Sequence, residues 1–171
     1  MNFDYTWKRD EANFWPVLSK EVHKWTHITC DILLQKWDTY YAFRRKSRPE
    51  HEAPPELQKN PEWVLFICHN LVIYWETMRE CISRIVVEQC WLSVIDYTVK
   101  DIRTFLMEES WWKKITQRAI VPFVVAYINE EPVPWMYWNE ISEVVSFTKD
   151  TIPNWFAWGK EKFLKQILNQ Q

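Results

Sequence analysis

The chain has a single glycine, Gly159, among 171 residues. An average glycine content of about 7% would give roughly twelve. Glycine is the residue that most readily takes a positive φ, so tight hairpins and many helix ends depend on it. We therefore expect few hairpins and disfavour an all-β fold. A Rossmann domain and a P-loop are excluded, because both need glycines where the backbone approaches phosphate.

The scarcity of glycine is matched by thirteen tryptophans, which would supply a large aromatic core. The rest of the composition is ordinary for a globular protein, with 47% hydrophobic and 26% charged residues. The net charge of −2 gives no general attraction to nucleic acid or to anionic membranes. So skewed a composition, without a repeat or a family motif, also fits a computationally designed (de novo) sequence.

The segment after Asn60-Pro61 contains no further proline until Pro122, and Asn60-Pro61 is itself typical of a helix start. Apolar residues then recur in steps of three and four, which predicts a long central helix over about residues 61–108. An alternative stays open, because the apolar runs Trp63–Ile67 and Leu71–Trp75 are short enough to form a β-hairpin.

Similar stripes predict further helices over about residues 13–46, 111–121, 123–128 and 134–148, with a last one from about residue 151. The proline-rich segment 48–60 is predicted to be a linker. The sequence therefore predicts an all-α fold, a single domain over residues 1–171 in which an irregular helical bundle surrounds the central helix. Short connections after residue 108 favour sequential packing of the later helices.

The four cysteines, Cys30, Cys68, Cys81 and Cys90, form no CxxC motif. We interpret them as small buried hydrophobic residues rather than as metal ligands. We expect no signal peptide, because the first residues carry an acid and no apolar run follows, and no apolar run approaches the ~20 residues that a membrane span needs. We expect a soluble, cytoplasmic protein that engages no membrane.

A basic run, Arg44-Arg45-Lys46-Ser47-Arg48, is the one sequence feature that could indicate a nucleic-acid surface. The alternative is that cations at the end of the first predicted helix complement its dipole. Because the chain has no basic surplus elsewhere, we favour the second interpretation and expect no nucleic-acid partner.

One pair of histidines and one single histidine could bind a metal or a cofactor. His23 and His27 are four residues apart and would share a helix face, but no third ligand accompanies them. His69 lies beside Cys68 in the most apolar stretch and could be an axial ligand to a haem-like cofactor or a polar anchor in a ligand pocket. The alternative, which we favour, is a histidine hydrogen-bonded within the core or lying at a helix edge.

No catalytic constellation is evident. GxSxG and the Glu-x-x-His pattern of di-iron bundles are both absent, and the paired carboxylates Glu108-Glu109 and Glu130-Glu131 fall at predicted element ends. We predict no catalytic residues, no metal site and no cofactor, and therefore a protein that is not an enzyme.

The adjacent aromatics Trp111-Trp112 and Trp135-Met136-Tyr137-Trp138 cannot all be buried by one helix face. A crowded core explains them most simply, and self-association is the second explanation. The favoured function is a non-enzymatic helical scaffold or interaction protein. Two alternatives are a carrier of an apolar or planar small molecule in a tryptophan-rich pocket, and a self-associating, coat-like structural protein.

Overall fold

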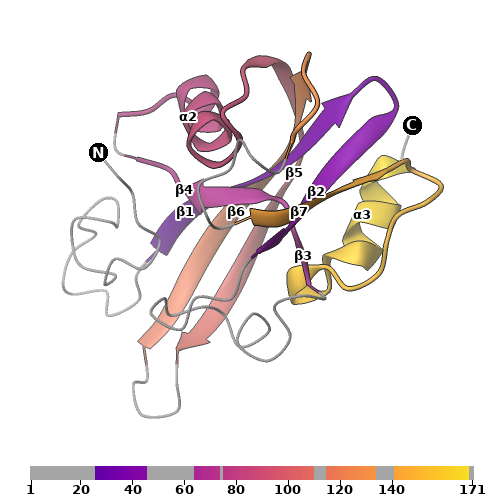
Figure 1. Ribbon diagram of the computed structural model, residues 1–171. Coiled ribbons are helices and arrows are strands. Elements are labelled where there is room, and N and C mark those ends of the chain that lie inside the picture. The colour runs from indigo at the N-terminus through magenta and orange to yellow at the C-terminus, as the bar shows by residue number, and fades with distance from the viewer. Residues whose placement is uncertain (1–25, 46–63, 74, 110–114, 134–140, 170–171) are drawn as a thin grey trace.

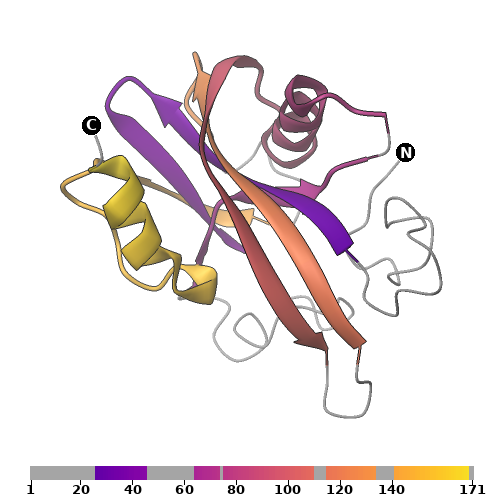
Figure 2. The same ribbon diagram turned by 180° about the vertical axis from the view of Figure 1, so that it is seen from behind.

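The computed structural model describes residues 26–45, 64–73, 75–109, 115–133 and 141–169. Within them one seven-stranded sheet has a helix on each face (Figures 1 and 2). The strands are β1 (Thr26–Lys36), β2 (Thr39–Arg45), β3 (Leu65–Phe66), β4 (Cys68–Leu71), β5 (Val94–Glu109), β6 (Ile115–Ile128) and β7 (Ile141–Phe147). The helices are α2 (Met78–Cys90) and α3 (Lys160–Leu168), with the short 3-10 helix η3 (Ala157–Gly159) before α3.

Strand β1 is the centre of the sheet, whose main order is β3-β2-β1-β6-β5. β1 and β6 are parallel, with Ile32 opposite Val124, and the other strand pairs are antiparallel. The second edge of β1 is shared by two partners: residues 29–32 pair with β4, and residues 34–36 pair with β2. The sheet therefore forks along β1.

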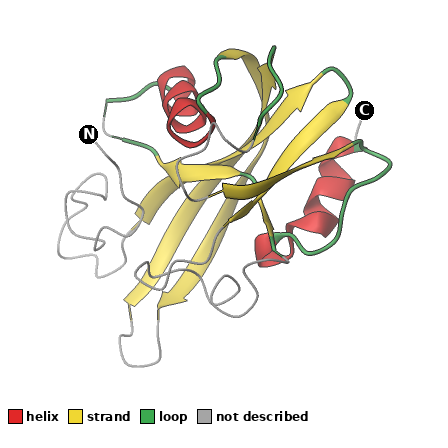
Figure 3. Ribbon diagram, viewed as in Figure 1, coloured by secondary structure: helices red, strands yellow, loops and turns green. Residues whose placement is uncertain are grey.

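Alternate residues of β1 face opposite layers, as the period of a strand requires. Cys30, Ile32 and Leu34 belong to the apolar cluster formed with α2. Leu33 belongs to a second cluster, formed with α3. Figure 3 shows the two helices on the two sides of the strands. Two cores thus sandwich one sheet, and neither helix in the described part is long and apolar enough to cross a membrane.

The predicted all-α bundle is wrong. The predicted central helix over residues 61–108 is β3, β4, α2 and β5, so the helical periodicity holds over α2 alone. The alternative hairpin is also wrong in its pairing, since β3 pairs with β2 and β4 pairs with β1. The described residues of the first predicted helix form the β1–β2 hairpin. The predicted linker 48–60 lies outside the described residues.

The error comes from the apolar runs. Residues 123–128 form the buried part of β6, and most of their side chains lie in one or the other core (Phe123, Val124, Val125, Ala126, Ile128). A strand covered on both faces is a continuous apolar run, which periodicity alone cannot distinguish from a buried helix. The later predicted helix over 134–148 contains β7, which is buried only at its two ends, and only the last predicted helix is helical, as α3.

Candidate functional site

Helix α2 begins with a capping box. The hydroxyl of Thr77 accepts the backbone N–H of Glu80 at 3.3 Å, and the Glu80 carboxylate accepts the backbone N–H of Thr77 at 2.8 Å. These bonds satisfy donors that a helix start otherwise leaves unpaired. Hydrogen bonding to Thr77 also lowers the pKa of the Glu80 carboxyl below its usual value.

The guanidinium of Arg84 pairs with one carboxylate just before α2 and with another near the end of the helix. It contacts Glu76 through two nitrogens and Glu88 at 3.0 Å. Burial alone would lower the pKa of Arg84, but the hydrogen bond and charge of Glu76, with the charge of Glu88, raise it above the ordinary value. The three side chains form a half-buried ionic network that links α2 to the segment just before it.

The second polar group lies on the opposite face of the sheet. Asp31 of β1 is opposite His69 of β4, and its Oδ1 lies 2.6 Å from His69 Nδ1. Lys160, the first residue of α3, donates from Nζ to Asp31 Oδ2 at 2.6 Å. Asp31 and Lys160 are buried, whereas the side chain of His69 is 15% exposed.

The charge state of Asp31 follows from these contacts. Burial alone would raise the pKa of the carboxyl, because a low-dielectric interior disfavours its charged form. The charge of Lys160 and the hydrogen bond from His69 outweigh that effect and hold the pKa well below its usual range. Asp31 is therefore an ionised carboxylate with both oxygens engaged.

The two polar groups are linked through one backbone segment. Gln89 of α2 donates to the His69 carbonyl at 2.7 Å and accepts the His69 N–H at 3.2 Å. The main chain of His69 is thus held by the helix on one face, while its side chain reaches a carboxylate on the other. An imidazole fixed by a carboxylate in this way can act as a general base or acid.

The other predicted residues have different outcomes. The four cysteines are buried and unbridged, which confirms their interpretation as small core residues. His27 is in β1, so the shared helix face proposed for it does not exist, and His23 lies outside the described residues. Trp111, Trp112, Trp135 and Trp138 also lie outside them, so self-association through these aromatics stays a prediction, as does the absence of a nucleic-acid partner.

The sequence pointed to His69 but not to its two partners. Asp31 is 38 positions before His69, and Lys160 is 129 positions after Asp31, so only the strand register and the position of α3 bring them together. One signal was available. Asp31 is a lone charge in the apolar run Cys30–Leu34, and a charge in such a place needs a partner.

The acidic side chains in α2 and just before it do not fit a centre for a divalent cation, which needs several oxygen ligands. Glu76 and Glu88 are paired with Arg84, and Glu80 is paired with Thr77. In the part of the chain that the structure describes, no three His, Cys, Asp or Glu side chains are grouped so that they could hold a metal ion.

Compared as a structure, the chain resembles the MutT Nudix hydrolase of Burkholderia pseudomallei, with a TM-score of 0.60 over 83% of this chain and 98% of that one. The MutT protein of Methanosarcina mazei Go1 gives 0.62 over 85% and 96%. Both are 13% identical to this chain. The chain shares the MutT-type Nudix fold. By sequence, no family model and no curated protein matches it.

This finding overturns the predicted function. A non-enzymatic helical scaffold, with its helical carrier and coat-like alternatives, is wrong, because the described residues form a sheet with a helix on each face, in the fold of a protein described as a Nudix hydrolase. The prediction that the chain is not an enzyme fails on the same ground. Sequence reasoning missed the Nudix-type fold because the strands that build it read as helices.

Proposed function

We propose that this chain is a hydrolase in which His69 acts as the general base. The observation that carries the proposal is the 2.6 Å contact between Asp31 Oδ1 and His69 Nδ1 in a fold shared with Nudix hydrolases. His69 is the member of the group with the most exposed side chain, so it is the one that a substrate or water would meet. Asp31 and Lys160 are positioning residues behind it.

The proposed step uses protein groups alone. With its proton on Nδ1, the imidazole donates to Asp31, and Nε2 becomes the acceptor nitrogen. Nε2 takes a proton from water while the water oxygen forms a bond to the electrophilic centre of the substrate. The imidazolium formed in this way is stabilised by the Asp31 carboxylate and gives its proton to the leaving group as the bond between that group and the electrophilic centre breaks. Lys160 keeps Asp31 ionised throughout, because its charge lowers the pKa of that carboxyl.

The proposal predicts a specific loss of activity. Purified protein is assayed against a carboxyl ester (p-nitrophenyl acetate), a phosphodiester (bis-p-nitrophenyl phosphate) and ATP. We expect turnover of at least one of them, and a decrease in kcat of about 10²–10⁴-fold in His69→Ala, because general-base catalysis contributes that much. Circular dichroism and thermal melting establish that the variant is folded.

A matched control is Asp96→Asn, which removes a carboxylate from an exposed ion pair with Arg79. Its kcat should equal that of the parent protein. The proposed role of His69 fails if folded His69→Ala keeps full activity, and the hydrolase assignment fails if the parent protein cleaves none of the three substrates.

We also propose that the protein acts in the cytoplasm. Its four cysteines are unbridged in the described residues, and Sγ of Cys68 and Cys90 lie 3.4 Å apart without a disulfide. Free thiols at such a separation are typical of a reducing compartment. Localisation of a fluorescent fusion in the source cells tests this point.

A further inference from the structure

Four residues other than glycine have a positive φ in the described part of the chain, and all four are tryptophan. They are Trp37 (φ 55°), Trp75 (φ 71°), Trp91 (φ 55°) and Trp155 (φ 71°). The one glycine, Gly159, also has a positive φ of 63°. Left-handed backbone brings Cβ close to a carbonyl oxygen, so it is normally taken by glycine, or by Asn and Asp, and not by bulky residues.

Two of these positions are recognisable glycine sites. Lys36 pairs with Thr39, so Trp37 is the first residue of a two-residue hairpin loop between β1 and β2. Hairpin loops of that length require a positive φ at the first position, which glycine usually supplies. Trp91 ends α2 in the left-handed conformation and donates to the Val87 carbonyl at 2.9 Å. That is the usual place of a C-terminal glycine.

The other two positions are also in turns or next to strand pairing. Trp75 is the third residue of the turn closed by the bond from Glu76 N to Ile73 O at 3.2 Å, just before α2. A positive φ at the third position of a turn again selects glycine. The Trp155 carbonyl accepts the Leu65 N–H at 2.9 Å, beside the bridge between Leu65 and Phe156.

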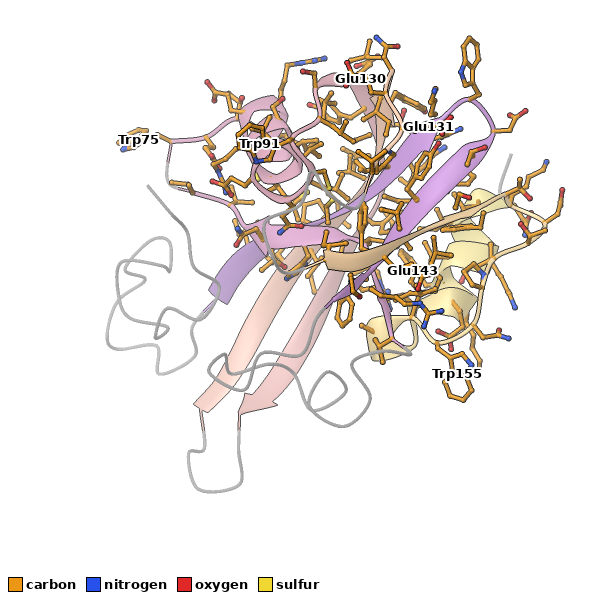
Figure 4. The ribbon with its side chains drawn as sticks, viewed as in Figure 1. Trp75, Trp91, Glu130, Glu131, Glu143 and Trp155 are labelled. Carbon is orange, nitrogen blue, oxygen red and sulfur yellow. The ribbon has the colours of Figure 1, made fainter. Side chains whose placement is uncertain are left out.

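The indole rings do not explain the choice of tryptophan. The four residues are 61–86% exposed, so little of their apolar surface is buried in return for the strained backbone. They do not form one binding surface either, because Trp75 and Trp155 lie on opposite sides of the molecule, while Trp91 lies beside α2 (Figure 4). Scattered exposed rings on left-handed backbone have no packing function.

We infer that these four positions are occupied by glycine in the protein made by its source cells, and that the codon which the sequence translates as tryptophan is decoded in those cells as glycine. The composition supports this independently. One glycine and thirteen tryptophans are extreme separately, but together they make up about 8% of the 171 residues, close to the average glycine share of ~7%. Glycine at positions 75 and 91 would also leave both ends of α2 without a bulky exposed ring.

The direct experiment is peptide mass spectrometry of the protein purified from the cells that encode it. Trypsin cleaves after Lys36 and Arg44, which releases residues 37–44 as one peptide. The same digest of protein expressed in Escherichia coli from a gene carrying tryptophan codons is the reference. We expect the native peptide to carry the mass of glycine at position 37. The mass of tryptophan there would overturn the inference.

A second experiment tests the conformational argument on the recombinant chain. Trp91→Gly and Trp37→Gly are compared with Trp91→Ala and Trp37→Ala, which remove the same ring but keep Cβ. We expect each glycine variant to have a folding equilibrium constant about five- to thirtyfold higher than its alanine counterpart, because left-handed backbone costs a residue with Cβ one or two kcal/mol. Equal stability of the glycine and alanine variants would overturn the claim that the positions require glycine.

Discussion

At the scale of single residues, Asp31 determines the geometry of the candidate site. A buried carboxylate is costly unless it is paired and hydrogen-bonded, and here one oxygen meets Lys160 while the other meets His69, each at 2.6 Å. Removing the carboxylate would leave Lys160 buried without its partner oxygen and His69 without the group that orients its ring. The same side chain therefore affects both stability and the proposed chemistry.

Asp31→Ala should lower the free energy of unfolding by about 3–5 kcal/mol at pH 7, because it breaks a buried charge pair by removing one partner. The contribution depends on pH. The pKa of Asp31 is lowered in the folded protein, so its stabilisation is complete above the unfolded value of about 3.9 and is lost as the pH falls through the folded value.

Urea denaturation between pH 7 and pH 2.5 measures this effect. The stability of the parent protein and that of Asp31→Ala should converge as the pH falls below about 4. Other carboxyl groups titrate in both proteins, so the difference between the two curves reports Asp31 together with its contacts to His69 and Lys160. Parallel curves over the whole range would contradict the assigned ion pair.

At the scale of elements, α2 was predictable and the strands were not. The positions Ile82, Ile85, Val86 and Cys90 are buried in steps of three and four, as a helix against a sheet requires. In β6 both faces are covered, so its residues show no period of two that would identify a strand. The hairpin of β1 and β2 was not predicted, because its residues showed a helical stripe and the scarcity of glycine disfavoured hairpins.

The start of α2 offers a test at this scale. Thr77→Ala removes the hydroxyl that accepts the Glu80 N–H and should lower the free energy of unfolding by about 1 kcal/mol. Ser83→Ala, inside the same helix, is the control and should leave stability unchanged or slightly raised, since alanine is the better helix former. Chemical denaturation measures both, and an equal effect of the two substitutions would show that the cap contributes nothing.

At the scale of the whole molecule, the fold is defined by pairing between distant segments. The parallel pair of β1 and β6 sets Ile32 against Val124, and α3 places Lys160 beside a residue of the first described strand. No local pattern encodes such pairings, which is why reasoning from the sequence could suggest His69 but not the site around it. A register of strands is a property of the assembled sheet.

Non-local pairing also predicts slow folding. A helical bundle of the kind first expected would fold in microseconds to milliseconds, whereas chains dominated by long-range strand pairing take milliseconds to seconds. We expect refolding after dilution from urea to fall in the slower range when followed by stopped-flow circular dichroism. Complete recovery of the signal within the dead time of mixing would contradict the long-range pairing of β1 with β6.

The fork in the sheet has a consequence for how the protein can change over generations. Because β1 gives residues 29–32 to β4 and residues 34–36 to β2, the hairpin that carries β2 is separate from the strand pair that carries Asp31 and His69. Insertions or deletions in the hairpin loop alter the register of β2 and of its neighbours β3 and β7, but not the match of Asp31 to His69. The pairing of β2 can therefore change while the pairing that holds Asp31 against His69 is kept.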